Sequence, residues 1–188
     1  ALTHHHAGRG GVHKTGALLQ AVEAFDVARS QLGYHEGNNT SQLHGESIGS
    51  SNYTEYGYWY GTQVQGSSSG FYASWCAYFI SWCARQAGIP TSIISNATYA
   101  CAGSDYGDFK NLDFYSRGSY TPKVGDLIFF DWPGDNTHWD HVEIVIGVSS
   151  SEVTTLGGNT GDNNVKSRSW SLDHSYIWGY GVPKYTTG

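Results

Sequence analysis

The chain has 188 residues, of which 39% are hydrophobic and only 14% are charged, so it is long enough for one well-filled core and too short for two ordinary domains. Its formal net charge is -6 and its 10 Lys and Arg residues are scattered, which leaves no basic stripe for a nucleic acid. No apolar run approaches the roughly 20 residues of a membrane-spanning helix. We therefore expect one monomeric globular unit that neither binds nucleic acid nor inserts into a membrane.

The N-terminal part of the chain divides into a leader and a helix. Residues 1–16 are rich in Gly and His, and we interpret them as a flexible leader or expression remnant ahead of one domain over 17–188. Residues 17–32 carry apolar side chains at three- and four-residue spacing, which predicts an amphipathic helix that ends at Gly33. The expected buried stripe of this helix consists of Leu18, Val22, Phe25, Ala28 and Leu32.

The rest of the chain predicts a loop, a second helix and a set of strands. Residues 37–70 are dominated by Asn, Ser, Gly and Tyr, which indicates a long loop region. Residues 76–87 have one apolar stripe and end before Gly88, which predicts a helix. Short strands are expected at 126–130, 141–148, 152–156, 165–170 and 176–181. The expected fold is α+β, with the N-terminal helices packed on a curled antiparallel sheet of about five to six strands.

Three residues with the chemistry of a thiol hydrolase follow one another along these elements. Cys76 opens the second helix, His141 opens a strand, and Asn159 closes the turn LGGN. A thiol is a useful nucleophile only as thiolate, which a helix N-terminus and a neighbouring imidazole favour. We expect Cys76 to be the nucleophile, His141 the base and Asn159 the group that orients the ring. The alternatives are a core cysteine, a base at His138 or His174, and an ordinary turn asparagine.

Several segments carry a family resemblance. The sequences WCAYFISWCARQAGIP, PKVGDLIFFDW, DHVEIVIGV, GGNTG and YIWGYGVPKY resemble the CHAP family of papain-like cysteine amidohydrolases and peptidases. The resemblance implies a papain-like fold and cleavage of an amide bond in bacterial peptidoglycan, either in the stem peptide or cross-bridge or between muramic acid and L-alanine. It implies the same roles for Cys76, His141 and Asn159, no required cofactor, and action at the bacterial cell wall by a secreted or phage-released protein.

One position departs from the family pattern. Many members carry a Glu two residues before the Asn, where this chain has Gly157. Glu143 lies two residues beyond His141 on the same strand, so it points to the same face and is a possible substitute. It is equally well interpreted as a solvated strand residue. The oxyanion would be met by the backbone N–H of Cys76 and a second donor from Tyr72 or Ser74.

Other candidate residues have a functional and a structural interpretation. The aromatic residues Trp75, Tyr58, Trp59 and Trp132 either wall a substrate groove or fill the core. Cys83 is expected in the core, and Cys101, in a loop, matches no catalytic element. A Cys83–Cys101 disulfide would leave Cys76 free, and the sequence leaves this pairing open.

Two groups of residues have the composition of a calcium loop without its full ligand spacing, so the sequence leaves calcium binding open and assigns no metal ligands. They are Asp131, Asp135 and Asp140, and Glu36, Asn38 and Asn39. Two other functions stay open: a cell-wall binding module with an impaired site, and an amidase that acts on a soluble glutathione-type conjugate.

Overall fold

The computed structural model describes residues 16–98, 109–133 and 139–186. Its helices are α1 (Gly16–Ser30), α2 (Glu55–Trp59) and α3 (Cys76–Gln86), and a π-helical turn, η1, covers Tyr60–Val64. Its strands are β1 (Asp113–Ser116), β2 (Leu127–Phe130), β3 (His141–Val148), β4 (Glu152–Thr160), β5 (Asn164–Ser171) and β6 (Ile177–Val182). The leader residues 1–15, together with Cys101, Asp135 and His138, lie outside the described residues.

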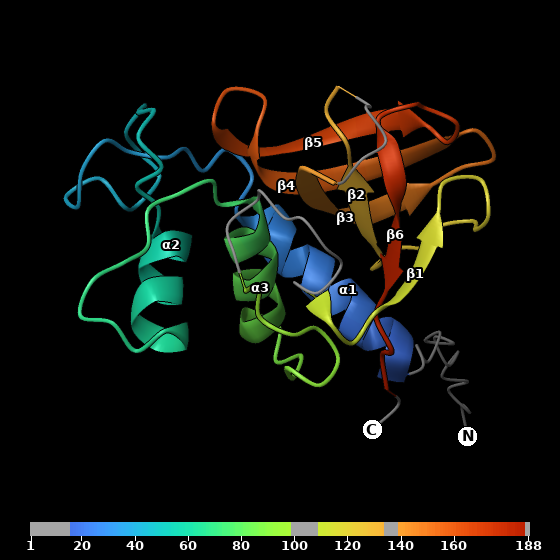
Figure 1. Cartoon of the computed structure of the whole chain (residues 1–188), viewed down its shortest axis with the longest axis horizontal. Helices are drawn as coiled ribbons and strands as arrows, with labels where there is room; N and C mark the ends of the chain where they lie inside the picture. The colour runs from blue at the N-terminus through green and yellow to red at the C-terminus, as the bar shows by residue number, and fades with distance from the viewer. Residues whose placement is uncertain (1–15, 99–108, 134–138, 187–188) are drawn as a thin grey trace, which may run out of the picture.

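Within the described ranges, the six strands form one sheet in the order β1-β6-β2-β3-β4-β5, and all neighbouring strands are antiparallel (Figure 1). The predicted α+β fold is confirmed. β3 has its predicted bounds, whereas β4 continues to Thr160, beyond the predicted end at 156. β1 was not predicted. Its burial pattern explains why, because three of its four side chains are exposed and it shows no apolar alternation.

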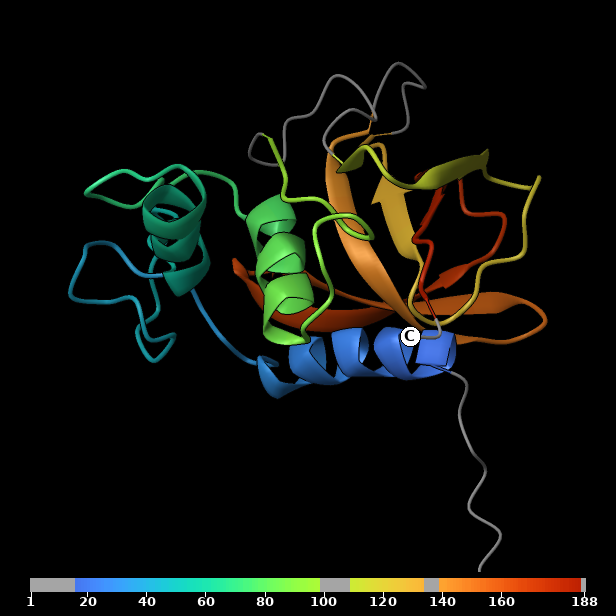
Figure 2. The same ribbon diagram turned by 90° about the horizontal axis from the view of Figure 1, so that it is seen from below.

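Apolar side chains cover both faces of the central strands. α3 packs on β3 and β4, and α1 packs on α3 (Figure 2). The face toward the helices carries Leu127, Phe129, Val142, Ile144 and Leu156. The opposite face carries a second cluster, formed by Ile128, Phe130, Val145, Val153, Ile177 and Tyr180, with Trp132 and Trp170 packed against it. Because β2 is buried on both faces, its sequence LIFF is a continuous apolar run.

The first helix lies where it was predicted, but its buried face is different. Ala21, Ala24 and Ala28 are buried, whereas Leu32, expected in the stripe, is 49% exposed just beyond the helix. Small side chains on this face allow α1 to approach α3 closely, so the larger residues are displaced to its flanks. Leu18 falls outside the described side chains. None of the helices in the described ranges is long and apolar enough to cross a membrane.

The interpretation of residues 37–70 as loop throughout was wrong, because α2 and η1 lie within them. Thr54 caps α2, since its side chain accepts a hydrogen bond from the backbone N–H of Gly57 at 3.0 Å. Tyr56 and Tyr60 are 0% and 1% exposed and anchor this short helical stretch in the core. The Tyr-rich composition therefore reflects buried anchors as well as loop residues.

Candidate active site

Cys76 is the first residue of α3 and is fully buried. At this position the positive end of the helix dipole favours a thiolate over a thiol. In this structure, however, Cys76 is disulfide-bonded. Cys83 is a free thiol that is 2% exposed, so the Cys83–Cys101 pairing left open by the sequence is not formed and the prediction of a core Cys83 is confirmed. Burial raises the pKa of the Cys83 thiol well above its ordinary value.

The N-terminal end of α3 is fixed by the residue before the cysteine. Trp75 is fully buried, and its Nε1 donates to Oε1 of Glu36 at 3.1 Å. A Cβ atom added at Gly158 would lie only 2.6 Å from Cζ3 of Trp75, so the indole lies directly on the β4 backbone. Trp75 is thus a core residue, which corrects the expectation that it walls a substrate groove.

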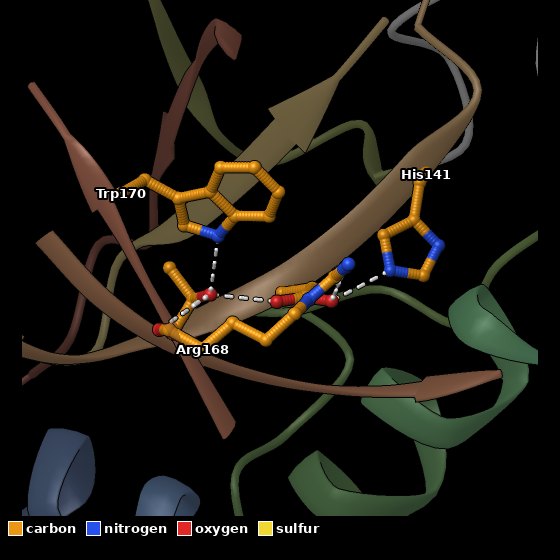
Figure 3. Close-up of polar contacts among 5 residues, drawn as sticks. His141, Arg168 and Trp170 are labelled. Carbon is orange, nitrogen blue, oxygen red and sulfur yellow. Dashed lines mark hydrogen bonds and ion pairs between the residues drawn. The ribbon is translucent and has the colours of Figure 1, made fainter. Parts of the chain in front are cut away.

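His141 is 4% exposed and its ring orientation is fixed by a carboxylate (Figure 3). Nε2 of His141 lies 2.8 Å from Oε2 of Glu143, and the other ring nitrogen, Nδ1, points away from this contact. The rings of Phe130 and Trp132 flank the imidazole, with centroids 6.1 and 5.6 Å from its own. The ring is therefore held from one side, and Nδ1 is the nitrogen that remains for proton transfer.

Glu143 has no exposed surface and is hydrogen-bonded to residues of β3, β4 and β5. Besides His141, it accepts from Oγ1 of Thr155 at 2.6 Å and from Nη2 of Arg168 at 2.9 Å (Figure 3). Burial by itself raises the pKa of a carboxyl group, but here the hydrogen bond and charge of His141, with Arg168 and Thr155, outweigh it and lower the pKa of Glu143. Glu143 is therefore an ionised acceptor and not the solvated strand residue of the alternative interpretation.

Two consecutive glycines of β4 let Glu143 and Trp75 pack closely against opposite faces of this strand. An added Cβ at Gly157 would lie 2.5 Å from Cγ of Glu143, whereas one at Gly158 would meet Trp75. Successive side-chain positions on a strand point to opposite faces. The end of α3 that carries Cys76 and the pair of His141 and Glu143 therefore approach the same stretch of β4 from its two sides.

The other predicted site residues differ in their exposure and contacts. Asn159 follows Gly158 with a φ of 54°, and its side chain makes no hydrogen bond within the described part of the chain. Tyr72 is half-buried and stacks on Tyr53 at a centroid distance of 4.3 Å, whereas Ser74 is exposed.

The remaining aromatic candidates keep some exposed surface. Tyr58 is 48% exposed and Trp59 is half-buried. Trp132 is half-buried and lies beside His141, so it is the one of the predicted groove residues that is placed next to the predicted base.

Sequence reasoning missed Arg168 and Thr155. Their roles depend on strand register, because Thr155 faces Arg168 across β4 and β5. The available sequence signal was Arg168 itself, a charged residue two positions before Trp170 in a predicted strand. The guanidinium of Arg168 lies 4.8 Å from the centroid of the Trp170 indole.

The calcium possibility finds no cluster to support it in the part of the chain that the structure describes. These ranges contain no group of three or more His, Cys, Asp or Glu side chains able to hold a metal ion. The carboxylate of Glu36 accepts from the backbone N–H of Asn52 at 2.5 Å, and that of Asp140 from the backbone N–H of Trp132 at 2.6 Å.

In this α+β fold a cysteine opens the core helix α3, and a carboxylate-bound histidine opens β3, a strand on which that helix packs. The CHAP domain family model matches residues 66–159, which is half of the chain. The chain belongs to the CHAP family, as its sequence motifs indicated.

Three solved structures illustrate the similarity. Ly7917 is 17% identical with a TM-score of 0.45, and the match covers 87% of this chain and 62% of Ly7917. The peptidoglycan hydrolase RipB from Mycobacterium tuberculosis is 14% identical with a TM-score of 0.48, covering 91% of this chain and 67% of RipB. PlyC is 13% identical with a TM-score of 0.46, covering 87% and 35%. Such distant likenesses carry no functional argument. No curated protein matches the chain in sequence.

Proposed function

We propose that this protein is a cysteine-dependent hydrolase that cleaves an amide bond of bacterial peptidoglycan. The observation that carries the proposal is the fixed ring of His141, whose Nε2 is bonded to Glu143 so that Nδ1 is left to act on a thiol. α3, which begins with Cys76, packs on the strand that begins with His141. Membership of the CHAP family supports this substrate and the cell wall as the place of action.

The reaction follows from the two side chains. Nδ1 of His141 takes the proton from Sγ of Cys76, and the thiolate attacks the carbonyl carbon of the amide. The backbone N–H of Cys76 meets the oxyanion, with Tyr72 or Ser74 as the candidate second donor. Collapse breaks the C–N bond, and His141 protonates the leaving amine. A water molecule deprotonated by His141 then hydrolyses the thioester and restores the thiol.

The nucleophile must first be released, because Cys76 is disulfide-bonded. A small thiol compound reduces the bond by exchange and is itself oxidised to a disulfide. The enzyme is therefore expected to act after reduction.

An impaired binding module would be favoured if the site lacked a carboxylate, because Gly157 stands where many family members carry Glu. Glu143 lies in the space beside Gly157 and supplies a carboxylate there, so this reason for the alternative no longer applies.

The test is clearing of purified Gram-positive peptidoglycan by the reduced protein, followed by mass analysis of the fragments. New L-alanine amino termini would indicate a muramoyl-alanine cut, and other new amino termini a cut in the stem peptide or cross-bridge. Cys76→Ala should abolish clearing, whereas Cys83→Ala should retain it. The proposal fails if several wall types stay intact although Cys76 is reduced and alkylatable. Binding to the wall without turnover would then favour the binding module. Cleavage of a soluble amide conjugate would favour the amidase that acts on a glutathione-type substrate.

A further inference from the structure

The carboxylate of Glu143 has each of its oxygens in a defined contact. Oε2 lies 2.8 Å from Nε2 of His141 and 2.9 Å from Nη2 of Arg168, and Oε1 lies 2.6 Å from Oγ1 of Thr155. Nε1 of Trp170 donates to the same Thr155 hydroxyl at 3.2 Å, and this hydroxyl has Glu143 as its near acceptor and the carbonyl oxygen of Arg168 as a longer one at 3.4 Å (Figure 3). Glu143 is thus held as an acceptor from β4 and β5 while it faces His141.

This arrangement sets the tautomer of the imidazole. An ionised carboxylate only accepts, so Nε2 of His141 must carry the proton that it shares with Glu143. In the neutral ring the acceptor is then Nδ1, the nitrogen required to take a proton from a thiol. When Nδ1 becomes protonated, the charge of Glu143, a carboxylate with no exposed surface, stabilises the imidazolium.

Gly157 leaves the space in which Glu143 lies. A Cβ at this position would fall 2.5 Å from Cγ and 2.8 Å from both Cδ and Oε2 of Glu143, distances that real Cβ contacts do not reach. Gly157 is not among the residues with positive φ, so its backbone would accept an L side chain. Glycine is needed here for space and not for conformation, and a side chain at 157 would compete with Glu143 for the same volume.

We propose that Glu143 is the positioning residue of His141 and that Gly157 is its structural complement, so that the strand positions 143 and 157 form one carboxylate site with room for a single side chain. The proposal rests on the hydrolase proposed above and gives Glu143 the role that the sequence assigned to Asn159. The side chain of Asn159 makes no hydrogen bond within the described residues, and Asn159 lies where the β4–β5 register shifts.

Other charged or titratable side chains in the described ranges lie near this network. Arg168 contacts Glu143, and the ring of His174 packs on Trp170 at a centroid distance of 5.1 Å. The carboxylate of Asp140 is bonded to the backbone of Trp132. Any pH effect of Glu143 must therefore be separated from theirs by variants at 143 itself.

The experiment measures iodoacetamide alkylation of reduced Cys76 against pH, which reports thiolate formation without any substrate. Glu143→Gln keeps the shape but loses the charge, so it should raise the apparent pKa of the Cys76 thiol by about one unit or more and slow alkylation near neutral pH. Glu152→Gln, an exposed glutamate on β4, is the matched control and should leave the profile unchanged. Thermal unfolding of each variant verifies that it is folded.

The shared site is tested by exchanging the carboxylate between the strands. Glu143→Ala and Gly157→Asp should each impair alkylation and wall clearing, and the double variant should recover part of both, because an aspartate at 157 places its carboxylate where Glu143 lies. The proposal is overturned if Glu143→Gln leaves the pH profile of Cys76 alkylation unchanged, or if the double variant recovers neither alkylation nor clearing. It is also overturned if Asn159→Ala shifts this pH profile and Glu143→Gln does not. If the parent protein clears no wall but the alkylation shifts occur, the hydrolase proposal fails and this one stands.

Discussion

The buried indole of Trp75 donates its N–H to Oε1 of Glu36, a residue that lies 39 positions earlier in the chain and is itself 1% exposed. The other carboxylate oxygen of Glu36 accepts the backbone N–H of Asn52 at 2.5 Å. One buried carboxylate thereby connects the start of α3 to the segment between α1 and α2. The position of Cys76 depends on this connection, because Trp75 is the residue directly before it.

Replacing Glu36 with alanine should destabilise the protein by roughly 2–4 kcal/mol, because it leaves the buried indole N–H of Trp75 and the backbone N–H of half-buried Asn52 without their acceptor. Glu36→Gln keeps one carbonyl oxygen in place and should cost less. Chemical unfolding at neutral pH measures both. If Glu36→Ala unfolds at the same denaturant concentration as the parent protein, the carboxylate does not hold the start of α3.

The sequence was sufficient for the elements that have a strong periodic pattern and clear end signals. α3 begins at Cys76 and is followed by Gly88 with a φ of 74°, as the stop signal predicted, and β3 begins at His141. The short helix α2 escaped prediction because five residues carry no helical period, and its cap at Thr54 is visible only from the geometry.

The sequence predicted which elements carry the candidate residues, but it predicted few of the contacts between these residues. The face shared by His141 and Glu143 follows from strand alternation alone. In contrast, the closeness of Gly157 to Glu143, and the contact of Arg168 with the same carboxylate, depend on the register of β3, β4 and β5. Register is set by pairing over the whole sheet and cannot be taken from one strand.

Reduction should be required for activity, because a disulfide-bonded sulfur cannot attack an amide. Without a reductant, native protein should give no iodoacetamide adduct at Cys76 and should not clear peptidoglycan. With a dithiol reductant, the adduct and the clearing should appear together. Cys83 lies in the middle of α3 and its thiol pKa is raised well above its ordinary value, so it should react far more slowly than Cys76 at the helix N-terminus until the protein unfolds. Full clearing by unreduced protein would contradict this prediction.

Acid should weaken the fold through Glu143, whose pKa is lowered to about 2 although burial opposes this, because His141, Arg168 and Thr155 stabilise its charge. In the unfolded chain a glutamate has a pKa of about 4.3. Between these two values the unfolded state binds more protons, so stability that is present above about pH 4.3 is lost as the pH falls toward 2.

The measurement is the unfolding temperature between pH 2 and pH 6, in steps that span this window of about two units. Glu143→Gln lacks the titrating group, so its unfolding temperature should fall less steeply with acid than that of the parent protein. Glu152→Gln should follow the parent curve. Parallel curves for the parent protein and Glu143→Gln would mean that Glu143 contributes nothing to acid sensitivity.

Gly158 should tolerate no side chain, because its added Cβ would lie 2.6 Å from Cζ3 of Trp75 and 2.9 Å from Cβ of Phe79. Both neighbours are buried and fully packed, so Gly158→Ala should cost roughly 1–3 kcal/mol through forced displacement of α3. Wall clearing should fall as well, because Cys76 moves with the helix relative to His141.

Gly147→Ala on β3 is the matched control, since its Cβ would meet no atom closer than 3.5 Å. That variant should change stability by less than about 0.5 kcal/mol and keep its activity. Equal unfolding curves for the two variants would show that α3 can shift away from β4 at little cost, and the contact between Trp75 and Gly158 would then not determine where Cys76 lies.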